Sequence, residues 1–212
     1  MIEFTVNGKF VRLEEQPGEM LSDLLRNRLG LTGTKVACQE DECGACTVLI
    51  EGQPILSCTY PAVKAHGQNV VTIEGLAETV PVFATRGELH PLQEAFIAYG
   101  AVQCGFCIPG QLMTAAALLQ HNPDPSEDEI KYALKDTLCR CAGYPSILGA
   151  IRAAARALQT ASPVEPPQIP ESATPRKAVG RIHPRPDAVE KVTGSARYTD
   201  DLSFEGMLHA RV

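Results

Sequence analysis

The residues of this sequence best suited to do chemistry are eight cysteines, which fall into two sets of four. The first set is Cys38, Cys43, Cys46 and Cys58, and the second set is Cys104, Cys107, Cys139 and Cys141. In a reducing compartment, thiols are usually free, metal-bound or catalytic. Two separate sets of four therefore predict two four-thiolate metal sites, with disulfides and scattered core thiols as the alternatives.

The first set has the spacing C-x(4)-C-x(2)-C followed by a distant fourth cysteine. This spacing is typical of plant-type 2Fe–2S sites, in which one tight loop supplies three thiolates. Backbone N–H groups of such a loop must point at the sulfurs to offset their charge, and Gly44 allows the close approach that this needs. Zinc is the main rival, but structural zinc usually shows two short cysteine knuckles. The first set therefore indicates an iron–sulfur cluster.

The second set has the spacing C-x(2)-C and then C-x-C, which zinc could also use. Its cysteines lie at the predicted ends of helices: Cys104 and Cys107 precede one helix, Cys139 closes another and Cys141 precedes the last. Positive helix N-termini stabilise thiolates, so helix ends that converge on a cluster are physically reasonable.

The elements that must position the first set read as a small mixed sheet crossed by one helix. Apolar and polar residues alternate over 2–6 and 9–13, on either side of the Asn7-Gly8 turn, which predicts a hairpin. A second hairpin is expected to turn at Glu51-Gly52. Leucines at helical spacing over residues 21–29 predict a helix that stops at Gly30. A further short strand is expected at residues 70–73.

The elements around the second set read as four short helices. Pro91 begins the first, residues 111–119 form the second, and Ser126 with Glu129 makes the capping box of the third. The third helix is expected to end at Cys139, and the fourth runs over residues 146–158. These helices predict a small bundle.

The end of the chain differs in composition from both units. Residues 161–178 hold five prolines and are expected to form an extended linker. Residues 179–212 hold strand-like runs at 191–199 and 207–212. We expect this segment to pack only against another domain and to contribute to neither cysteine site.

Three segments carry a family resemblance: CQEDECGACTVLIEG, QCGFCIPG and CRCAGYPSI. Together they resemble the iron–sulfur subunit of the xanthine dehydrogenase and aldehyde oxidoreductase family of molybdenum hydroxylases, and the resemblance covers about residues 1–160. Many relatives have Gly-Gly where this chain has Asp41-Glu42. Residues 179–212 resemble the opening of the molybdenum-binding subunit of the same family.

The resemblance implies an α+β fold in four parts. These are a ferredoxin-like (β-grasp) 2Fe–2S domain over residues 1–78, a four-helix 2Fe–2S domain over 79–160, the linker 161–178, and the start of a molybdopterin-binding domain over 179–212. It also implies two 2Fe–2S clusters in series, with all eight cysteines as ligands.

The resemblance further implies the direction of electron transfer. The helical-domain cluster would face the molybdopterin of a large partner, with Gln103 and Cys141 on the pterin side; an ordinary polar residue at a helix end is the alternative for Gln103. The other cluster would pass electrons to FAD in a separate subunit or to an external acceptor. The reaction would be hydroxylation of an aldehyde or N-heterocycle with water.

Composition narrows the remaining classes of function. The net charge is −6, so a general nucleic-acid binder is disfavoured. The sequence shows neither a signal peptide nor a twin-arginine motif, which predicts a cytoplasmic protein. It also lacks the Walker A, dinucleotide-binding, HExxH and G-x-S-x-G motifs, so no catalytic residue is expected in this chain. The alternatives are a zinc-bound interaction protein and a free-standing ferredoxin with an unrelated extra domain.

Overall fold

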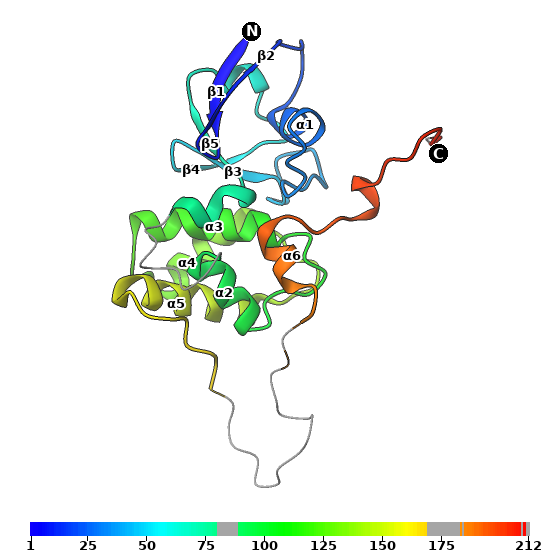
Figure 1. Ribbon diagram of the computed structural model, residues 1–212. Helices are drawn as coiled ribbons and strands as arrows, with labels where there is room; N and C mark the ends of the chain where they lie inside the picture. The colour runs from blue at the N-terminus through cyan, green and yellow to red at the C-terminus, as the bar shows by residue number, and fades with distance from the viewer. Residues whose placement is uncertain (80–88, 169–182, 184, 209, 211–212) are drawn as a thin grey trace.

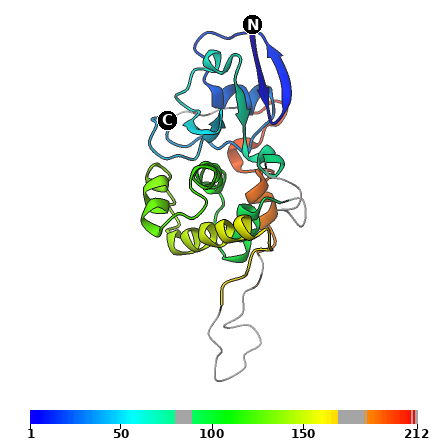
Figure 2. The same ribbon diagram turned by 90° about the vertical axis from the view of Figure 1, so that its left-hand side faces the viewer.

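The computed structural model describes residues 1–79, 89–168, 183, 185–208 and 210. A β-sheet unit lies against a layer of helices, and the last helix runs along one side where the two meet (Figure 1). The turned view shows the same stacking of sheet unit on helices (Figure 2). Within these residues, no helix combines the length and the apolar character that a membrane crossing requires.

The sheet has five strands in the order β2-β1-β5-β3-β4. Their bounds are β1 Ile2–Val6, β2 Lys9–Leu13, β3 Thr47–Ile50, β4 Gln53–Leu56 and β5 Asn69–Val71. Strand β5 is central and pairs in parallel with β1, while the other pairings are antiparallel. Both predicted hairpins are confirmed, and Asn7 and Gly8 have the positive φ angles of 49° and 74° that a two-residue turn requires.

The helix that crosses the sheet begins as predicted but then widens. Helix α1 covers only Leu21–Asp23, and a π-helical turn follows over Leu24–Arg28. The amide of Leu29 donates to the carbonyl of Leu24, five residues back, at 3.1 Å. Short 3₁₀ turns occupy Ala62–Ala65 and Ile73–Thr79. The sheet and this helix enclose one hydrophobic core, whose members include Ile2, Phe4, Leu21, Leu24, Leu25 and Val48.

The second unit contains the four predicted helices, and their bounds are α2 Pro91–Ala98, α3 Ile108–His121, α4 Glu127–Ala133 and α5 Tyr144–Thr160. The predicted helix start at Pro91 and the Ser126 and Glu129 capping box are confirmed. Helix α3 packs on β3, so the apolar core of the helical unit continues to Leu49 and Ile73 at the edge of the sheet unit.

The third helix ends earlier than the sequence predicted. Helix α4 stops at Ala133, and a 3₁₀ turn over Leu134–Asp136 leads into irregular chain. Cys139 therefore lies in a loop and does not close the helix, which corrects the prediction. The Tyr144 hydroxyl accepts the amide of Cys139 at 2.8 Å, so a side chain holds this loop where helical hydrogen bonds were expected.

The segment after the linker also differs from the prediction. The run 191–199 does not form a strand: Ala188–Thr193 form helix α6, and a 3₁₀ turn follows at Thr199–Asp201. Helix α6 packs on α2 and α3 of this same chain (Figure 1). Met207 and Leu208 are not in a strand, and the rest of that run is outside the described residues apart from Ala210.

Two of the boundaries predicted from composition fall largely outside the described residues. They are the junction at 79–88 and linker residues 169–178. The described linker residues, 162–168, have no regular secondary structure.

Candidate metal centres

The first cysteine loop is wound by residues in the left-handed conformation. Gln39, Asp41 and Gly44 have φ angles of 59°, 64° and 69° within the loop that runs from Cys38 to Cys46. Such residues reverse the backbone locally and turn successive N–H groups toward one side. The loop has this conformation although only Gly44 of these three residues is a glycine.

The N–H groups of this loop point at sulfur, as expected. The amide of Glu40 lies 3.5 Å from Cys38 Sγ. Hydrogen bonding from the backbone of Glu40, together with the amides of Glu42 and Cys43, lowers the pKa of Cys38 to about 7, against the opposing effect of burial. The loop therefore favours a thiolate at Cys38 even without a metal ion.

The four thiols of the first set lie as two neighbouring pairs. The side chains of Cys38 and Cys43 are hydrogen-bonding partners, and so are those of Cys46 and Cys58. All four are free thiols. Burial raises the pKa of Cys46 to about 12, so this thiol releases its proton readily only when a metal ion replaces it.

The second set shows the same arrangement of two pairs. Cys104 pairs with Cys141, and Cys107 with Cys139. Cys107 precedes α3, as the sequence predicted, and is its N-cap because the helix begins at Ile108, earlier than expected. Burial raises the pKa of both Cys104 and Cys107, whereas the amide of Cys104 lowers the pKa of Cys141.

The donor chemistry of the thiols fits a 2Fe–2S cluster. Each set brings cysteine side chains close enough to interact with one another. Four cysteine thiolates are the ligands of such a cluster, and each set supplies four.

The two cysteine loops touch each other through their backbones. The amide of Leu138 donates to the carbonyl oxygen of Cys43 at 3.0 Å. Gly110, in the first turn of α3, lies so close that a β-carbon there would be 2.1 Å from the carbonyl oxygen of Gly44. The Gln111 side chain adds a hydrogen bond to the carbonyl of Thr137 at 3.0 Å. No sequence pattern predicts this contact, because it joins backbone atoms of segments that are distant in the chain.

Gln103, predicted with Cys141 to face the pterin, lies close to the segment that follows Cys141. Gln103 and Cys104 are exposed, and Cys141 is half-buried. A β-carbon at Gly143 would lie 3.1 Å from Gln103 Nε2, so the Gln103 side chain packs over the loop that follows Cys141. Of the other two cysteines of this set, Cys139 is buried and Cys107 is half-buried.

Residues beyond the linker reach the second site, which the sequence did not predict. The Tyr198 hydroxyl donates to the carbonyl of Cys104 at 3.0 Å, and Lys191 Nζ donates to the carbonyl of Gln103 at 3.2 Å. The prediction that this segment packs only against another domain is therefore wrong. Single hydrogen bonds between distant residues leave no periodic pattern in a sequence, so sequence reasoning could not find these two.

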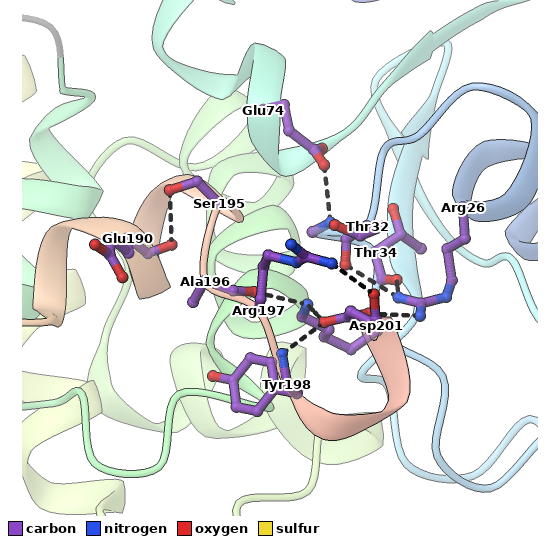
Figure 3. Close-up of polar contacts among 12 residues, drawn as sticks. Arg26, Thr32, Thr34, Glu74, Glu190, Ser195, Ala196, Arg197, Tyr198 and Asp201 are labelled. Carbon is purple, nitrogen blue, oxygen red and sulfur yellow. Dashed lines mark hydrogen bonds and ion pairs between the residues drawn. The ribbon is translucent and has the colours of Figure 1, made fainter. Parts of the chain in front are cut away.

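The same segment is anchored on the sheet unit by a buried ion cluster (Figure 3). Asp201 binds Arg26 at 2.7 Å and Lys35 at 3.0 Å, and the side chains of Lys35 and Asp201 are each only 2% exposed. Lys35 Nζ also lies 4.7 Å from the centre of the Tyr198 ring. We call residues 185–201 the clasp, because they join the sheet unit to the second cysteine loop.

Two family descriptions match this chain. Residues 4–70 match the 2Fe-2S iron-sulfur cluster binding domain, and residues 72–152 match the 2Fe-2S binding domain. The first match contains the first cysteine set and the second contains the other set.

Similar proteins extend these matches. The nicotinate dehydrogenase small FeS subunit of Eubacterium barkeri is 44% identical over 71% of this chain and 92% of its own length. The crystal structure of quinoline 2-oxidoreductase from Pseudomonas putida 86 is similar with a TM-score of 0.68 and 43% identity, over 75% of this chain and 95% of that one.

A longer relative also matches the clasp region. The structure of aldehyde oxidoreductase from Desulfovibrio gigas is similar with a TM-score of 0.79 and 37% identity, over 95% of this chain. The match takes in 22% of that protein, so this chain spans about a fifth of its length.

Proposed function

The chain belongs to the iron–sulfur components of the molybdenum hydroxylase family, and we propose that it carries electrons from a molybdenum-binding partner to an outside acceptor. Two 2Fe-2S binding domains in one chain support this function. The relatives support the partner, because they are small subunits or much longer chains.

We assign the cluster ligands as the sequence predicted. Cys38, Cys43, Cys46 and Cys58 would hold one cluster, and Cys104, Cys107, Cys139 and Cys141 the other. Each bound cluster supplies reversible one-electron chemistry at a potential that its surroundings set. The cysteines provide the ligands, the backbone N–H groups offset their negative charge, and burial of Cys46 and Cys139 keeps water from the inner pairs.

The observation that carries this proposal is the contact between the two cysteine loops. The hydrogen bond joins the amide of Leu138, the residue before Cys139, to the carbonyl of Cys43 itself. Two redox centres on separate folding units could lie at any separation. Here the ligand-bearing loops touch, which is the arrangement that transfer of electrons between them requires.

The exposed ends of the two sites indicate where electrons enter and leave. Gln103 and Cys104 are exposed, and we propose that Gln103 and Cys141 face molybdopterin in the partner. Cys38 and Cys43 are the half-exposed pair of the first site. We propose that electrons leave from this pair to FAD in a separate subunit or to an external acceptor.

The substrate chemistry would belong to the partner. The relatives are named for nicotinate, quinoline and aldehydes. We therefore propose an aldehyde or an N-heterocycle as the substrate of the assembled enzyme, hydroxylated with oxygen from water. This chain would contribute no catalytic residue.

Metal analysis and electron paramagnetic resonance (EPR) of the anaerobically purified chain test the proposal. We expect about four irons and about four inorganic sulfides per chain. The reduced protein should show two distinct EPR signals, because one site lies in a sheet loop and the other among helix ends. Stoichiometric zinc, or a single cluster, would overturn the assignment.

A further inference from the structure

Lys191 places a buried positive charge against the second cysteine loop. It belongs to α6 of the clasp, and its side chain is only 10% exposed. Its ammonium donates to the carbonyl of Gln103, the residue before Cys104, at 3.2 Å. A lysine of this kind is rarely buried without a specific partner.

Close packing fixes the lysine against the loop. Gly105 has a φ of +92°, and a β-carbon there would lie 2.5 Å from Lys191 Cδ and 2.6 Å from Tyr198 Oη. Tyr198 in turn donates to the carbonyl of Cys104. The loop and the clasp therefore leave no space between them, and the ammonium has little freedom to move away.

The charge of Lys191 is not cancelled by its ion pair. Its acidic partner is Asp187, at 2.7 Å, and the Asp187 carboxylate also binds Arg185. Two cations share one carboxylate, so the group keeps one net positive charge. Asp187 and Arg185 are about half exposed, which screens them more than the buried lysine.

That positive charge lies against the backbone of the ligand loop. The ammonium binds the carbonyl of Gln103, the residue before the ligand Cys104, and the stem of the lysine packs on Gly105, the residue after it. A cation fixed beside a cluster stabilises the extra negative charge of its reduced form. Net charge and hydrogen bonding are among the main determinants of iron–sulfur potentials.

We propose that Lys191 raises the reduction potential of the cluster held by the second cysteine set, and so makes that cluster a better electron acceptor. The proposal rests on the cluster assignment made above. It gives the clasp a role in electron transfer, because Lys191 binds the loop backbone beside the ligand Cys104.

The test is a mediated redox titration of the intact chain, followed by EPR. In each titration a chemical reductant supplies one electron per cluster, which reduces one Fe(III) to Fe(II). The signal of the second cluster is identified as the one that Cys139→Ser abolishes. Lys191→Met removes the charge but keeps the length of the side chain, and Lys191→Arg restores the charge. Arg152→Met is the control, because Arg152 is an exposed cation on α5 that lines no cysteine site.

We expect Lys191→Met to make reduction of the second cluster about tenfold less favourable, which is about 59 mV for one electron. The other cluster should shift much less, and both Lys191→Arg and Arg152→Met should titrate like the unsubstituted chain. If Lys191→Met fails to retain the cluster, Lys191→Gln, which keeps a donor for the Gln103 carbonyl, is titrated instead.

The outcomes separate the two proposals. An unchanged potential in the neutral variants, or an equal shift in Arg152→Met, overturns the role of Lys191. Absence of the second EPR signal from the unsubstituted chain overturns the cluster assignment itself.

Discussion

The amide of Leu138 donates a 3.0 Å hydrogen bond to the carbonyl oxygen of Cys43, so one backbone contact joins the two cysteine loops. The Leu138 side chain is 56% exposed and takes no part in this bond. Substitution of that side chain therefore leaves the contact intact. Only a substitution that pushes the two loops apart can test the effect of this hydrogen bond.

Gly110→Ala should separate the loops, because its new β-carbon would lie 2.1 Å from the Gly44 carbonyl oxygen. We expect a loss of about 1–3 kcal/mol in the free energy of unfolding, typical of an overpacked contact. We also expect weaker magnetic coupling between the two reduced clusters. Denaturant unfolding and EPR relaxation measure these two quantities.

The matched control for this variant is Gly149→Ala, which also adds a methyl group to a helix glycine. Its β-carbon would meet only the Tyr99 ring, at 3.0 Å and 3.3 Å. It should leave the cluster coupling unchanged. If both variants changed that coupling equally, the contact between the loops would not be what determines the magnetic coupling of the clusters.

Cys43→Ser should damage the first cluster alone, and Cys139→Ser the second alone, because each set of four thiols lies within one folding unit. Each variant should lose about half of the iron and labile sulfide. EPR of the reduced protein should show one remaining signal, a different one in each variant. Loss of both clusters from one substitution would mean that the sites are not independent.

Asp201→Asn should loosen the clasp, because it removes the carboxylate that binds the buried Lys35 at 3.0 Å. Burial already lowers the pKa of Lys35, and Asp201 opposes this. Removing one partner of a buried ion pair typically costs about 3–5 kcal/mol. Hydrogen exchange of the α6 amides should therefore become much faster. Asp200→Asn, in the same turn but on an exposed residue, should leave exchange unchanged.

The stability of the helical unit should depend on the protonation of His90. His90 caps α2, and its Nδ1 accepts the amide of Leu92 at 3.0 Å, which requires a neutral ring. Burial lowers its pKa from 6.5 to about 4. Between these values the unfolded state binds more protons, so stability is full above pH 6.5 and falls as the pH drops toward 4.

This linkage amounts to about 2 kcal/mol between pH 7 and pH 5. His90→Asn keeps a capping side chain but does not titrate, so its unfolding free energy should change less over this range. Urea unfolding at several pH values measures the difference. Identical pH slopes for the two proteins would contradict the assignment to His90.

Local patterns in the sequence predicted most of the fold and the sites. The Asn7-Gly8 hairpin and the capping box at Ser126 depend on neighbouring residues, so the sequence reveals them directly. The spacing of the eight cysteines makes them candidate ligands, because the cluster chemistry constrains that spacing tightly.

The clasp could not be predicted, because its stability comes from distant contacts. Helix α6 has only six residues, too few to show a helical period, and its valines and threonine favour a strand by propensity. What fixes it as a helix includes the hydrogen bond from the Gln93 side chain to the Val192 carbonyl, at 2.8 Å. Likewise, Lys35 and Asp201 are 166 residues apart, and neither is unusual in its local sequence.

The clasp also sets an order of events during synthesis. Tyr198 lies 94 residues after Cys104, so all four cysteines of the second set leave the ribosome before the residue that covers their loop. Until then the loop is open to whatever delivers iron and sulfide. Docking of the clasp then fixes the backbone of this loop through Tyr198 and Lys191. The four ligands of the second site are therefore synthesised before the residues that fix the position of their loop.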